Sequence, residues 1–401
     1  MTALTAGGER ARATLRHLMV RAAALRYSRP PRALPERPRR LLVIRPDHLG
    51  DVLFLTPALA HLRRTLPDAH ITALVGPWAA PLLAHSPDVD AVETLAFPWF
   101  DRRPRRSWLD PYRRLFHGAR ALRGRFDVAL IMRFDHWWGG WLAAEARIPH
   151  RVGYATPLLT PFLTHPLPYR PGRHEVAHNL ALCGVWGPSA PAAPERHPLH
   201  FRPSPADVEA LEVLQVPAGS GPLVAVHPGS GAPVKRWLPQ KWAALLDHLH
   251  QHHGARLVIT GSGAERPLAH EIAERTTAPV RLLAGQTTLG QLAALFAQCD
   301  LVVGPDCGPL HLAVAVGTPT VHLYGPVDPA QFGPWGPAER HRVVVEPLPC
   351  QFCHRLDWPE EHLEDHPCVT GIPLERVLAE VDALLKGQHS PPPETTTSTR
   401  G

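Results

Sequence analysis

An acidic side chain follows the first strongly apolar run of the chain, in the segment IRPDHLGDVLFLTPAL at 44–59. The run predicts a buried strand, Gly50 a turn, and the residues after it a helix. Asp51 then lies at the carboxyl end of the strand, where open α/β folds bind their ligands. A carboxylate at this place can take a proton from a nucleophilic hydroxyl. It can equally serve as the N-cap of the helix, and the pattern alone leaves both interpretations open.

A second strand-to-helix turn has the residues of a phosphate site, in VVGPDCGPLHLAVAVGTP at 302–319. Pro309 suits the first turn of a helix, so Gly308 and its neighbours would present free backbone N–H groups to an anion. Asp306 lies at the turn itself. His311 falls within the first helical turn, where it either reaches the same spot or packs against the sheet.

Two glycine-containing loops add charged residues. In HPGSGAPVKRW, Lys235 follows small residues that allow close backbone approach, which suits a phosphate, although the spacing is not that of a Walker A loop. In ITGSGAER, Gly261 and Gly263 begin a dinucleotide fingerprint, but Arg266 stands where its third glycine belongs, so a dehydrogenase is not indicated. Glu265 beside this loop either binds a ribose hydroxyl or caps the following helix.

Three cysteines near the end of the chain, Cys350, Cys353 and Cys368, have three histidines between them. Zinc binds such side chains, but a paired arrangement of two Cys-x-x-Cys motifs is absent. We therefore expect no catalytic metal, and a structural metal in this loop is the less favoured interpretation.

The elements that would position these residues follow an α/β pattern. Apolar runs without polar alternation, such as 41–45 and 126–133, are separated by segments of helical periodicity. This pattern predicts parallel sheets covered by helices on both faces. A segment rich in Pro, Ala and Ser from Gly184 to Asp207 predicts a linker between two Rossmann-like halves.

The expected domain order accommodates a chain of 401 residues, which is too long for one core. It consists of a basic N-terminal extension, an N-terminal domain, a linker, a C-terminal domain, a last helix and a disordered tail, at 1–40, 41–183, 184–207, 208–372, 373–387 and 388–401.

The composition favours a cytoplasmic protein with an anionic partner. No apolar run approaches the roughly 18 residues of a membrane span, and arginines interrupt every apolar stretch of the N-terminus, so no secretory signal is indicated. The net charge is +6. The extension predicts a helix that is either an amphipathic contact with anionic lipid at the inner face of the membrane or a solvated segment, with one stripe formed by Leu15, Leu18, Ala22 and Leu25.

Four segments in this order resemble glycosyltransferase family 9, the heptosyltransferases of the GT-B fold. They are RPDHLGDVLFLTPALAHLRRTLPDAHIT, HPGSGAPVKRWLPQKWAALL, ITGSGAER and GPDCGPLHLAVAVGTPTVHLYGPVDPAQFGPWG. They lie in both halves, between Leu41 and about Ile372, so the resemblance extends over most of the chain. The resemblance implies an α/β fold class with two Rossmann-like domains facing each other across a cleft.

The resemblance also implies an inverting, metal-independent transfer of a sugar from a nucleotide-sugar donor, typically ADP-heptose, to a cell-envelope saccharide or glycolipid. It assigns Asp51 the role of the general base that deprotonates the acceptor hydroxyl. Donor binding is assigned to Lys235, Glu265, Asp306, Cys307, Gly308 and His311. No cofactor is expected, because a lysine and a helix N-terminus can supply the positive potential that a departing diphosphate needs.

An arginine-rich stretch at 100–126 lies in the domain that resembles the acceptor-binding half. It is either a solvated basic helix or a surface that attracts an anionic acceptor, with candidate contacts at Arg102, Arg103, Arg105 and Arg106. No nucleic-acid module is recognisable, so nucleic acid is not an expected partner.

One departure from the family pattern and two alternative functions stay open. Cys307 stands where the family usually has Ser or Thr, which removes a hydroxyl that could contact the donor. The function itself has two alternatives, namely a GT-B transferase with a different nucleotide sugar and a sugar-nucleotide-binding protein without turnover.

Overall fold

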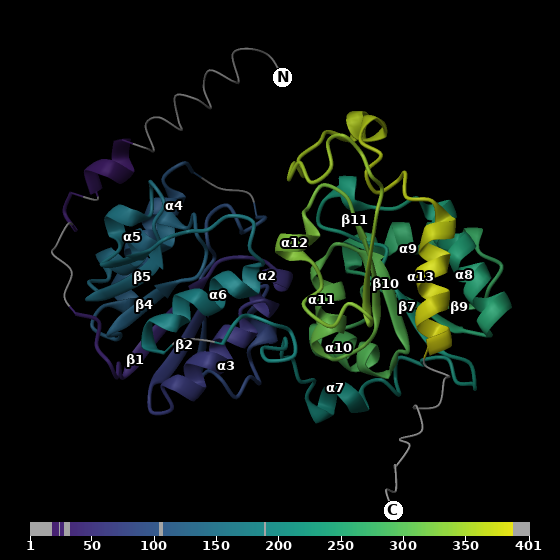
Figure 1. Ribbon diagram of the computed structural model, residues 1–401, viewed down its shortest axis with the longest axis horizontal. Helices are drawn as coiled ribbons and strands as arrows, with labels where there is room; N and C mark the ends of the chain where they lie inside the picture. Colours follow the sequence, from purple (N-terminus) through teal and green to yellow (C-terminus); the bar gives the residue numbers. More distant parts are fainter. Residues whose placement is uncertain (1–17, 24, 28–32, 104–106, 188–189, 388–401) are drawn as a thin grey trace, which may run out of the picture. The chain divides into compact units, whose positions relative to one another are not determined.

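The computed structural model describes residues 18–23, 25–27, 33–103, 107–187 and 190–387 (Figure 1). The chain divides into two units, Met1–Arg202 and Pro203–Gly401, with the division inside the segment predicted as a linker. The predicted disordered tail and the first position of the predicted N-terminal stripe, Leu15, lie outside the described residues.

The N-terminal unit is built on a parallel sheet of six strands in the order β3-β2-β1-β4-β5-β6. Its strands are β1 (Arg40–Arg45), β2 (His70–Val75), β3 (Ala91–Thr94), β4 (Val128–Ile131), β5 (His150–Tyr154) and β6 (His165–Leu167). The central strands are apolar and buried because helices cover both faces.

The helices of this unit pack in two groups, α3 with α6 and α4 with α5. They are α2 (Leu49–Leu53), α3 (Thr56–Thr65), α4 (Asp110–Leu122), α5 (Trp137–Glu145) and α6 (Glu175–Cys183), with short 3-10 turns η1 (Ala80–Leu82), η2 (Thr160–Phe162) and η3 (Gly184–Trp186).

The C-terminal unit repeats the same sheet order. Read from β9, its strands run β9-β8-β7-β10-β11-β12, all parallel, which matches the N-terminal sheet strand by strand. They are β7 (Leu223–Val226), β8 (Arg256–Ile259), β9 (Val280–Leu282), β10 (Leu301–Pro305), β11 (Thr320–Tyr324) and β12 (His341–Val345). The predicted fold class of two Rossmann-like α/β halves is confirmed.

Helices of the C-terminal unit again form two groups, α8 with α9 and α13, and α10 with α7 and α11. They are α7 (Pro205–Glu209), α8 (Pro239–His253), α9 (Arg266–Arg275), α10 (Leu289–Gln298), α11 (Gly308–Ala315), α12 (Pro329–Phe332) and α13 (Leu374–Gly387), with η4 (Pro233–Lys235), η5 (Gly263–Glu265) and η6 (Glu360–Asp365).

The single helix predicted after Asp51 is wrong, because the structure has two helices there, α2 and α3. Pro57 lacks the N–H that would continue the first helix, so the chain turns and starts again. The Thr56 hydroxyl donates to the Leu53 carbonyl at 2.7 Å. Asn179 of α6 donates to the Phe54 carbonyl at 3.0 Å, which satisfies the backbone at the break.

The described part of the N-terminal extension is held to the N-terminal unit by a buried apolar residue and by polar contacts. Val20 is fully buried in the apolar core, and the Tyr27 hydroxyl donates a hydrogen bond to Glu145 of α5. Two residues of the predicted stripe face away from this contact, since Leu18 is 59% and Leu25 is 80% exposed. This segment is therefore anchored, with Leu18 and Leu25 turned outward.

Candidate functional site

Polar residues gather at one place in each unit, where the two central strands of the sheet end. In sheets of this order the chain leaves these two strands in opposite directions, and ligands bind at that switch point. We call the residues after β1 and β4 and their partner on α6 the N-terminal half-site; they are Arg45, Asp47, Asp51, Arg133, Asp135 and Glu175. We call the residues after β7, β8 and β10 the C-terminal half-site; they are His227, Lys235, Glu265, Asp306, Cys307, Gly308 and His311.

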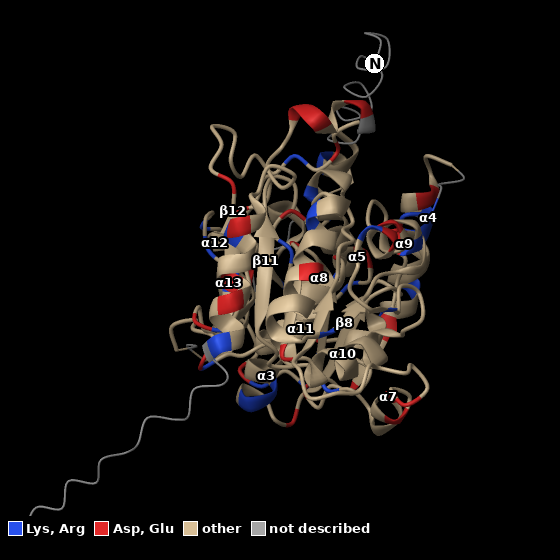
Figure 2. Ribbon diagram, turned by 90° about the vertical axis from the view of Figure 1, so that its right-hand side faces the viewer, with Lys and Arg blue, Asp and Glu red and all other residues tan. Residues whose placement is uncertain are grey.

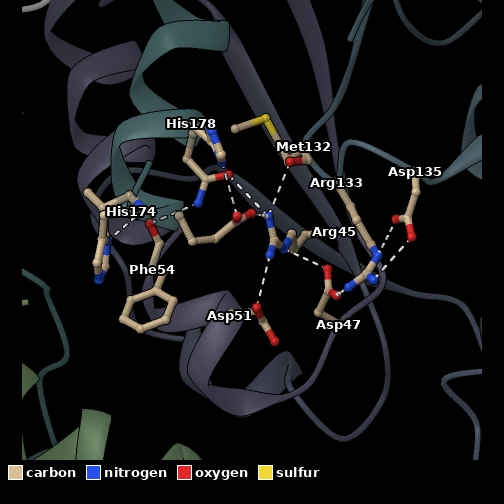
Figure 3. A network of polar contacts seen from close by, with 12 residues as sticks. Arg45, Asp47, Asp51, Phe54, Met132, Arg133, Asp135, His174 and His178 are labelled. Carbon is tan, nitrogen blue, oxygen red and sulfur yellow. Dashed lines mark hydrogen bonds and ion pairs between the residues drawn. The ribbon is translucent and has the colours of Figure 1, made fainter. Parts of the chain in front are cut away.

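A buried guanidinium organises the N-terminal half-site (Figure 3). Arg45 ends β1, and its side chain is only 1% exposed. Its Nε lies 2.7 Å from Asp47 Oδ2, its Nη1 donates to Glu175 Oε1 at 2.7 Å, and its Nη2 donates to Asp51 Oδ1 at 3.2 Å. Three carboxylates therefore converge on one positive charge. Arg133, after β4, adds a second charge by pairing with Asp47 and Asp135.

The two arginines do not stabilise the ionised forms of the three carboxylates equally. Burial alone would raise the pKa of Asp47, but Arg45 and Arg133 overcome it and lower that pKa. Burial would also raise the pKa of Glu175, but Arg45 and His178 lower it. For Asp51 the balance reverses, because burial and the charge of Asp47 outweigh Arg45 and raise its pKa to about 7. Asp51 is thus the carboxylate of this group that exchanges a proton near neutral pH.

Asp51 is also the most accessible of these three acids. Its side chain is 28% exposed, against 2% for Asp47 and 7% for Glu175. It lies within the first turn of α2, whose N-cap is His48, so the interpretation of Asp51 as the N-cap is wrong. An accessible carboxylate with a pKa near the working pH has the properties of a general base.

The supporting residues Arg45, Asp47 and Glu175 were not singled out from the sequence. Arg45 and Asp47 carried a signal, because charged residues directly after an apolar strand must find partners when buried. Glu175 carried a weaker signal, because it is the first residue and the only acid of the segment EVAHNLALC. Its helix α6 was not predicted, so nothing placed it beside β1.

The described start of the arginine-rich stretch, residues 100–103, lies beside the N-terminal half-site; we call it the arginine-rich loop. The ring of Phe100 is 6.4 Å from that of His48. Burial and then the nearby charge of Arg102 lower the pKa of His48, which precedes Asp51 by one helical turn. Arg103 donates to Asp101 from Nε at 2.9 Å and from Nη2 at 3.0 Å, so its charge is largely offset. The other two predicted contacts, Arg105 and Arg106, lie outside the described residues.

In the C-terminal half-site, a lysine, an aspartate and a histidine come together from separate segments. Lys235 Nζ is 2.7 Å from Asp306 Oδ2, and His311 Nε2 is 3.7 Å from Asp306 Oδ1. Burial alone would raise the pKa of Asp306, but Lys235 and then His311 hold it well below its usual range. Asp306 is therefore a fixed negative charge that holds Lys235 at the turn before α11.

Cys307 and Gly308 form the start of α11, as the sequence predicted. Cys307 is the extended N-cap residue, and its side chain makes no capping hydrogen bond. Burial raises the pKa of its thiol well above the usual range, so it stays protonated. The charges of Asp306, Glu265 and Lys235 all reach this thiol, which places the four side chains in one neighbourhood. In the first turn the Gly308 N–H is available to an anion, whereas Pro309 has no N–H and that of Leu310 donates to the Cys307 carbonyl at 3.2 Å.

Glu265 caps the turn that precedes α9. Its carboxylate accepts a hydrogen bond from the Ser262 backbone N–H at 2.7 Å, within a capping box. It also lies 4.0 Å from His227 Nε2. The loop after β7 passes so close that a Cβ on Gly229 would lie 2.0 Å from Glu265 Oε1. The predicted capping contact is present, and the ribose contact stays a prediction.

The three cysteines of the candidate metal loop differ in their exposure. Cys350 and Cys353 are exposed and Cys368 is buried. Across the part of the chain that the structure describes, the one group of His, Cys, Asp or Glu ligand atoms close enough for an ion involves other residues, His248, His253 and Asp382. Within the same described residues, no helix combines the length and apolarity needed to cross a membrane.

Comparisons with known proteins identify the family of the chain. Residues 115–363 match the model of glycosyltransferase family 9 (heptosyltransferase). Lipopolysaccharide heptosyltransferase 3 of Escherichia coli is 27% identical over 87% of this chain and 98% of its own length. Lipopolysaccharide heptosyltransferase 2 of Salmonella typhimurium is 28% identical over 86% of this chain and 98% of its own length.

Two solved structures share the fold. A family 9 glycosyl transferase from Veillonella parvula has a TM-score of 0.71 at 22% identity and covers 88% of this chain and 99% of its own. The E. coli ADP-heptose lps heptosyltransferase II has a TM-score of 0.68 at 24% identity and covers 88% of this chain and 100% of its own.

Proposed function

The chain belongs to glycosyltransferase family 9, the heptosyltransferase family, and on that premise we propose that it transfers a heptose from ADP-heptose to the saccharide core of lipopolysaccharide. Its curated relatives are named for heptosyltransferase activity on lipopolysaccharide, and a solved structural neighbour is named for the ADP-heptose donor. The observation that carries the proposal is the state of Asp51, an accessible carboxylate with a pKa raised to about 7 at a sheet switch point.

In the proposed reaction, Asp51 takes the proton of an acceptor hydroxyl. The hydroxyl oxygen forms a bond to the anomeric carbon of the heptose, and the bond from that carbon to the phosphate oxygen breaks. Attack opposite the leaving group inverts the configuration at the anomeric carbon. A base works best when its pKa is near the operating pH, and that of Asp51 is. Arg45 positions the carboxylate and, by sharing its charge among three acids, leaves it basic.

The leaving diphosphate is bound, in this proposal, by the C-terminal half-site. Lys235 supplies an ammonium, and the N–H groups at the start of α11 supply a positive dipole end. Asp306 orients Lys235 without titrating near neutral pH, since its pKa is lowered. These groups can stabilise the charge that develops on the diphosphate. We therefore propose that the transfer needs no metal ion.

We place the acceptor beside the arginine-rich loop, where Arg102 is exposed and lies near His48. The acceptor's phosphates or acidic sugars would be attracted there. A lipid-linked acceptor also requires access to a membrane surface. We therefore propose that the N-terminal unit docks on an anionic lipid surface at the cytoplasmic side of the membrane.

The proposed docking face surrounds α5. Among the described residues nine large apolar side chains are exposed, and five belong to this unit, namely Leu18, Leu25, Trp99, Trp108 and Phe116. Ring contacts connect two of them to tryptophans of α5, Trp99 to Trp137 at 5.5 Å and Phe116 to Trp141 at 6.2 Å. Exposed arginines lie on the neighbouring helix α4, and Figure 2 shows blue positions along it. Aromatic and cationic side chains together suit an anionic interface.

Vesicle flotation tests this face. The protein should float with phosphatidylcholine vesicles that contain phosphatidylglycerol and should remain below with phosphatidylcholine alone. Changing Leu18 and Leu25 to Ser should reduce flotation, whereas Val213→Ser, at an 81% exposed site in the C-terminal unit, should not. Equal binding to both kinds of vesicle, or equal losses in both variants, would contradict the proposed face.

A donor screen tests the function itself. Thermal unfolding is measured with ADP-, UDP-, GDP- and dTDP-sugars, and transfer is measured with a lipopolysaccharide core acceptor. We expect a shift with ADP-heptose and product formation with the same donor. A shift with another nucleotide sugar alone would identify a transferase with a different donor. Binding without any transfer would identify a binding protein.

A further inference from the structure

Two histidines of α8 converge on one carboxylate of α13, away from both half-sites. His248 Nε2 is 2.9 Å and His253 Nε2 is 2.7 Å from Asp382 Oδ1. All three ligand atoms lie within 4.8 Å of one another. From this geometry we propose that His248, His253 and Asp382 form a binding site for one divalent transition-metal ion of the zinc class, which joins α8 to α13.

The backbone holds these side chains in place. The two helices pack against each other, and Figure 1 shows them side by side. Asp382 follows Val381, which is fully buried, so its position on α13 is fixed by the core. The last turn of α8 is fixed by Gly254, a left-handed C-cap at φ 60°, whose N–H bonds to the carbonyl of His250. A glycine suits this conformation because it has no Cβ.

The ligand chemistry fits zinc or a similar ion. Two imidazoles and one carboxylate form a common ligand set for zinc and other divalent first-row metals, with the remaining positions left to water. Zinc-to-ligand bonds of about 2.0–2.1 Å separate ligand atoms by about 3.3 Å in a tetrahedron. The present contacts of 2.7 and 2.9 Å are slightly shorter. Small side-chain rotations would therefore admit the ion.

The charge and the exposure of the site also suit a cation that arrives from solvent. The three side chains are 14–27% exposed, so they are held by the fold but remain accessible. Burial alone would raise the pKa of Asp382, but the hydrogen bonds from His253 and His248 lower it, so the carboxylate is ionised. Histidine binds a metal ion as the neutral ring, so each Nε2 would give its lone pair to the ion while the ring proton stays on Nδ1.

An ion here would connect parts of the chain that are 129 residues apart, His253 and Asp382. Joining distant segments limits the unfolded chain, so the C-terminal unit should become more stable. α8 starts at Pro239, four residues after Lys235. The proposed ion is structural and stands independently of the metal-free transfer chemistry proposed above.

The test uses full-length protein without a histidine tag, stripped with a chelator, then titrated with Zn²⁺ against a chromophoric competitor. We expect one site that binds at least tenfold more tightly than the remaining histidines of the chain, and a higher unfolding temperature when it is filled. Cobalt(II) should give visible absorption bands of a low-coordinate histidine site.

Matched variants decide between a built site and incidental binding. His253→Gln keeps a donor for Asp382, so it should fold normally in the absence of metal, yet it should weaken Zn²⁺ binding at least tenfold. Asp382→Asn should do the same. His250→Gln, at an exposed position of the same helix, should leave binding unchanged. Binding that is equal in wild type and His253→Gln, or that falls as much in His250→Gln, would overturn the proposal.

Discussion

The two half-sites occupy the same place in two sheets of the same strand order, but Asp51 in one and Asp306 in the other have pKa values shifted in opposite directions. In the N-terminal half-site three acids converge on Arg45, and the pKa of Asp51 rises to about 7. In the C-terminal half-site one acid meets a lysine and a histidine, and the pKa of Asp306 falls. Burial acts to raise both pKa values, and the charged groups around each carboxylate decide whether that rise is overcome.

This difference separates two chemical roles that one fold can perform. A carboxylate in excess over its cations is ready to accept a proton. A carboxylate outnumbered by cations stays charged and orients them. We therefore expect changes at Asp51 to act on the reaction rate and changes at Lys235 to act on donor binding.

Replacing the base should have the largest effect. Asp51→Asn keeps the shape and a hydrogen bond to Arg45 but cannot accept the proton. The rate constant of transfer should fall by about 10²–10⁴, the usual contribution of general base catalysis. Donor affinity, measured by calorimetry with ADP-heptose or a stable analogue, should change little.

Asp68→Asn is the control for this variant, because Asp68 is an exposed carboxylate of the same unit, between α3 and β2, and lies outside the N-terminal half-site. Its rate should stay near that of wild type. Full transfer activity in Asp51→Asn would show that another group takes the proton.

Removing the ammonium should have the next largest effect, on the other side of the comparison. Lys235→Ala should weaken donor binding by about 10- to 100-fold, because a hydrogen bond to a charged group contributes about 1.5–3 kcal/mol. The dissociation constant is measured with the nucleotide diphosphate and with the sugar nucleotide.

Lys386→Ala supplies the matched control, since it removes an exposed ammonium from α13 of the same unit. It should leave the donor dissociation constant unchanged. If Lys235→Ala retains wild-type affinity, the phosphate groups are bound by other residues and the proposed role of α11 loses its charged partner.

The sequence predicted the parts of this comparison that are local along the chain. Asp51, Asp306 and Gly308 follow apolar runs directly, and a strand followed by a helix places such residues at a sheet edge. The Rossmann-like class was predictable for the same reason, from apolar runs alternating with helical segments. Pro57 carried the signal for the break between α2 and α3, although it was read as part of one helix.

The charge balance could not be predicted, because it depends on residues brought together from far apart. Glu175 lies 130 positions from Arg45 in the sequence. Strands β5 and β6 and helix α6, which carry the chain to that position, have short or mixed patterns and were not predicted. The burial of Asp51, which is the largest cause of its pKa shift, and the added charge of Glu175 both depend on contacts that the sequence does not show.

The pH dependence of transfer tests that balance directly. Asp51 must be ionised to act, so the rate should fall about tenfold per pH unit below its pKa of about 7. Glu175→Gln removes one negative charge and leaves Arg45 freer to attract Asp51. Both effects lower the pKa of Asp51, so the acidic limb of the profile should move to lower pH.

Stability gives a second readout with a definite sign. The folded protein disfavours ionised Asp51, so the contribution of this group to stability falls as pH rises from about 4 to about 7. Asp51→Asn should therefore unfold at a higher temperature than wild type above neutrality, and the difference should shrink in acid. In the pH profile of the transfer rate, an acidic limb that does not move in Glu175→Gln would mean that a group other than Asp51 titrates.

The smallest predicted effect concerns Cys307, where the C-terminal half-site relies on backbone groups. Cys307 is an N-cap without a capping hydrogen bond, so Cys307→Ser should let a hydroxyl accept from the N–H of Leu310. The gain should be about 0.5 kcal/mol, or about 1–2 °C in the unfolding temperature of a unit of this size. Cys299→Ser is the control, since that buried thiol already donates to the Leu295 carbonyl and ends a helix instead of starting one.

A lower unfolding temperature in Cys307→Ser would show that the apolar surroundings of the thiol outweigh the cap. Donor binding should survive the change in either case, because the N–H groups of α11 are unaltered. A change of one atom at Cys307 is therefore expected to be nearly silent, while a change of one atom at Asp51 should abolish most of the rate. In the proposed mechanism amide dipoles and an ammonium bind the anion in the C-terminal half-site, whereas the N-terminal half-site depends on a single proton acceptor.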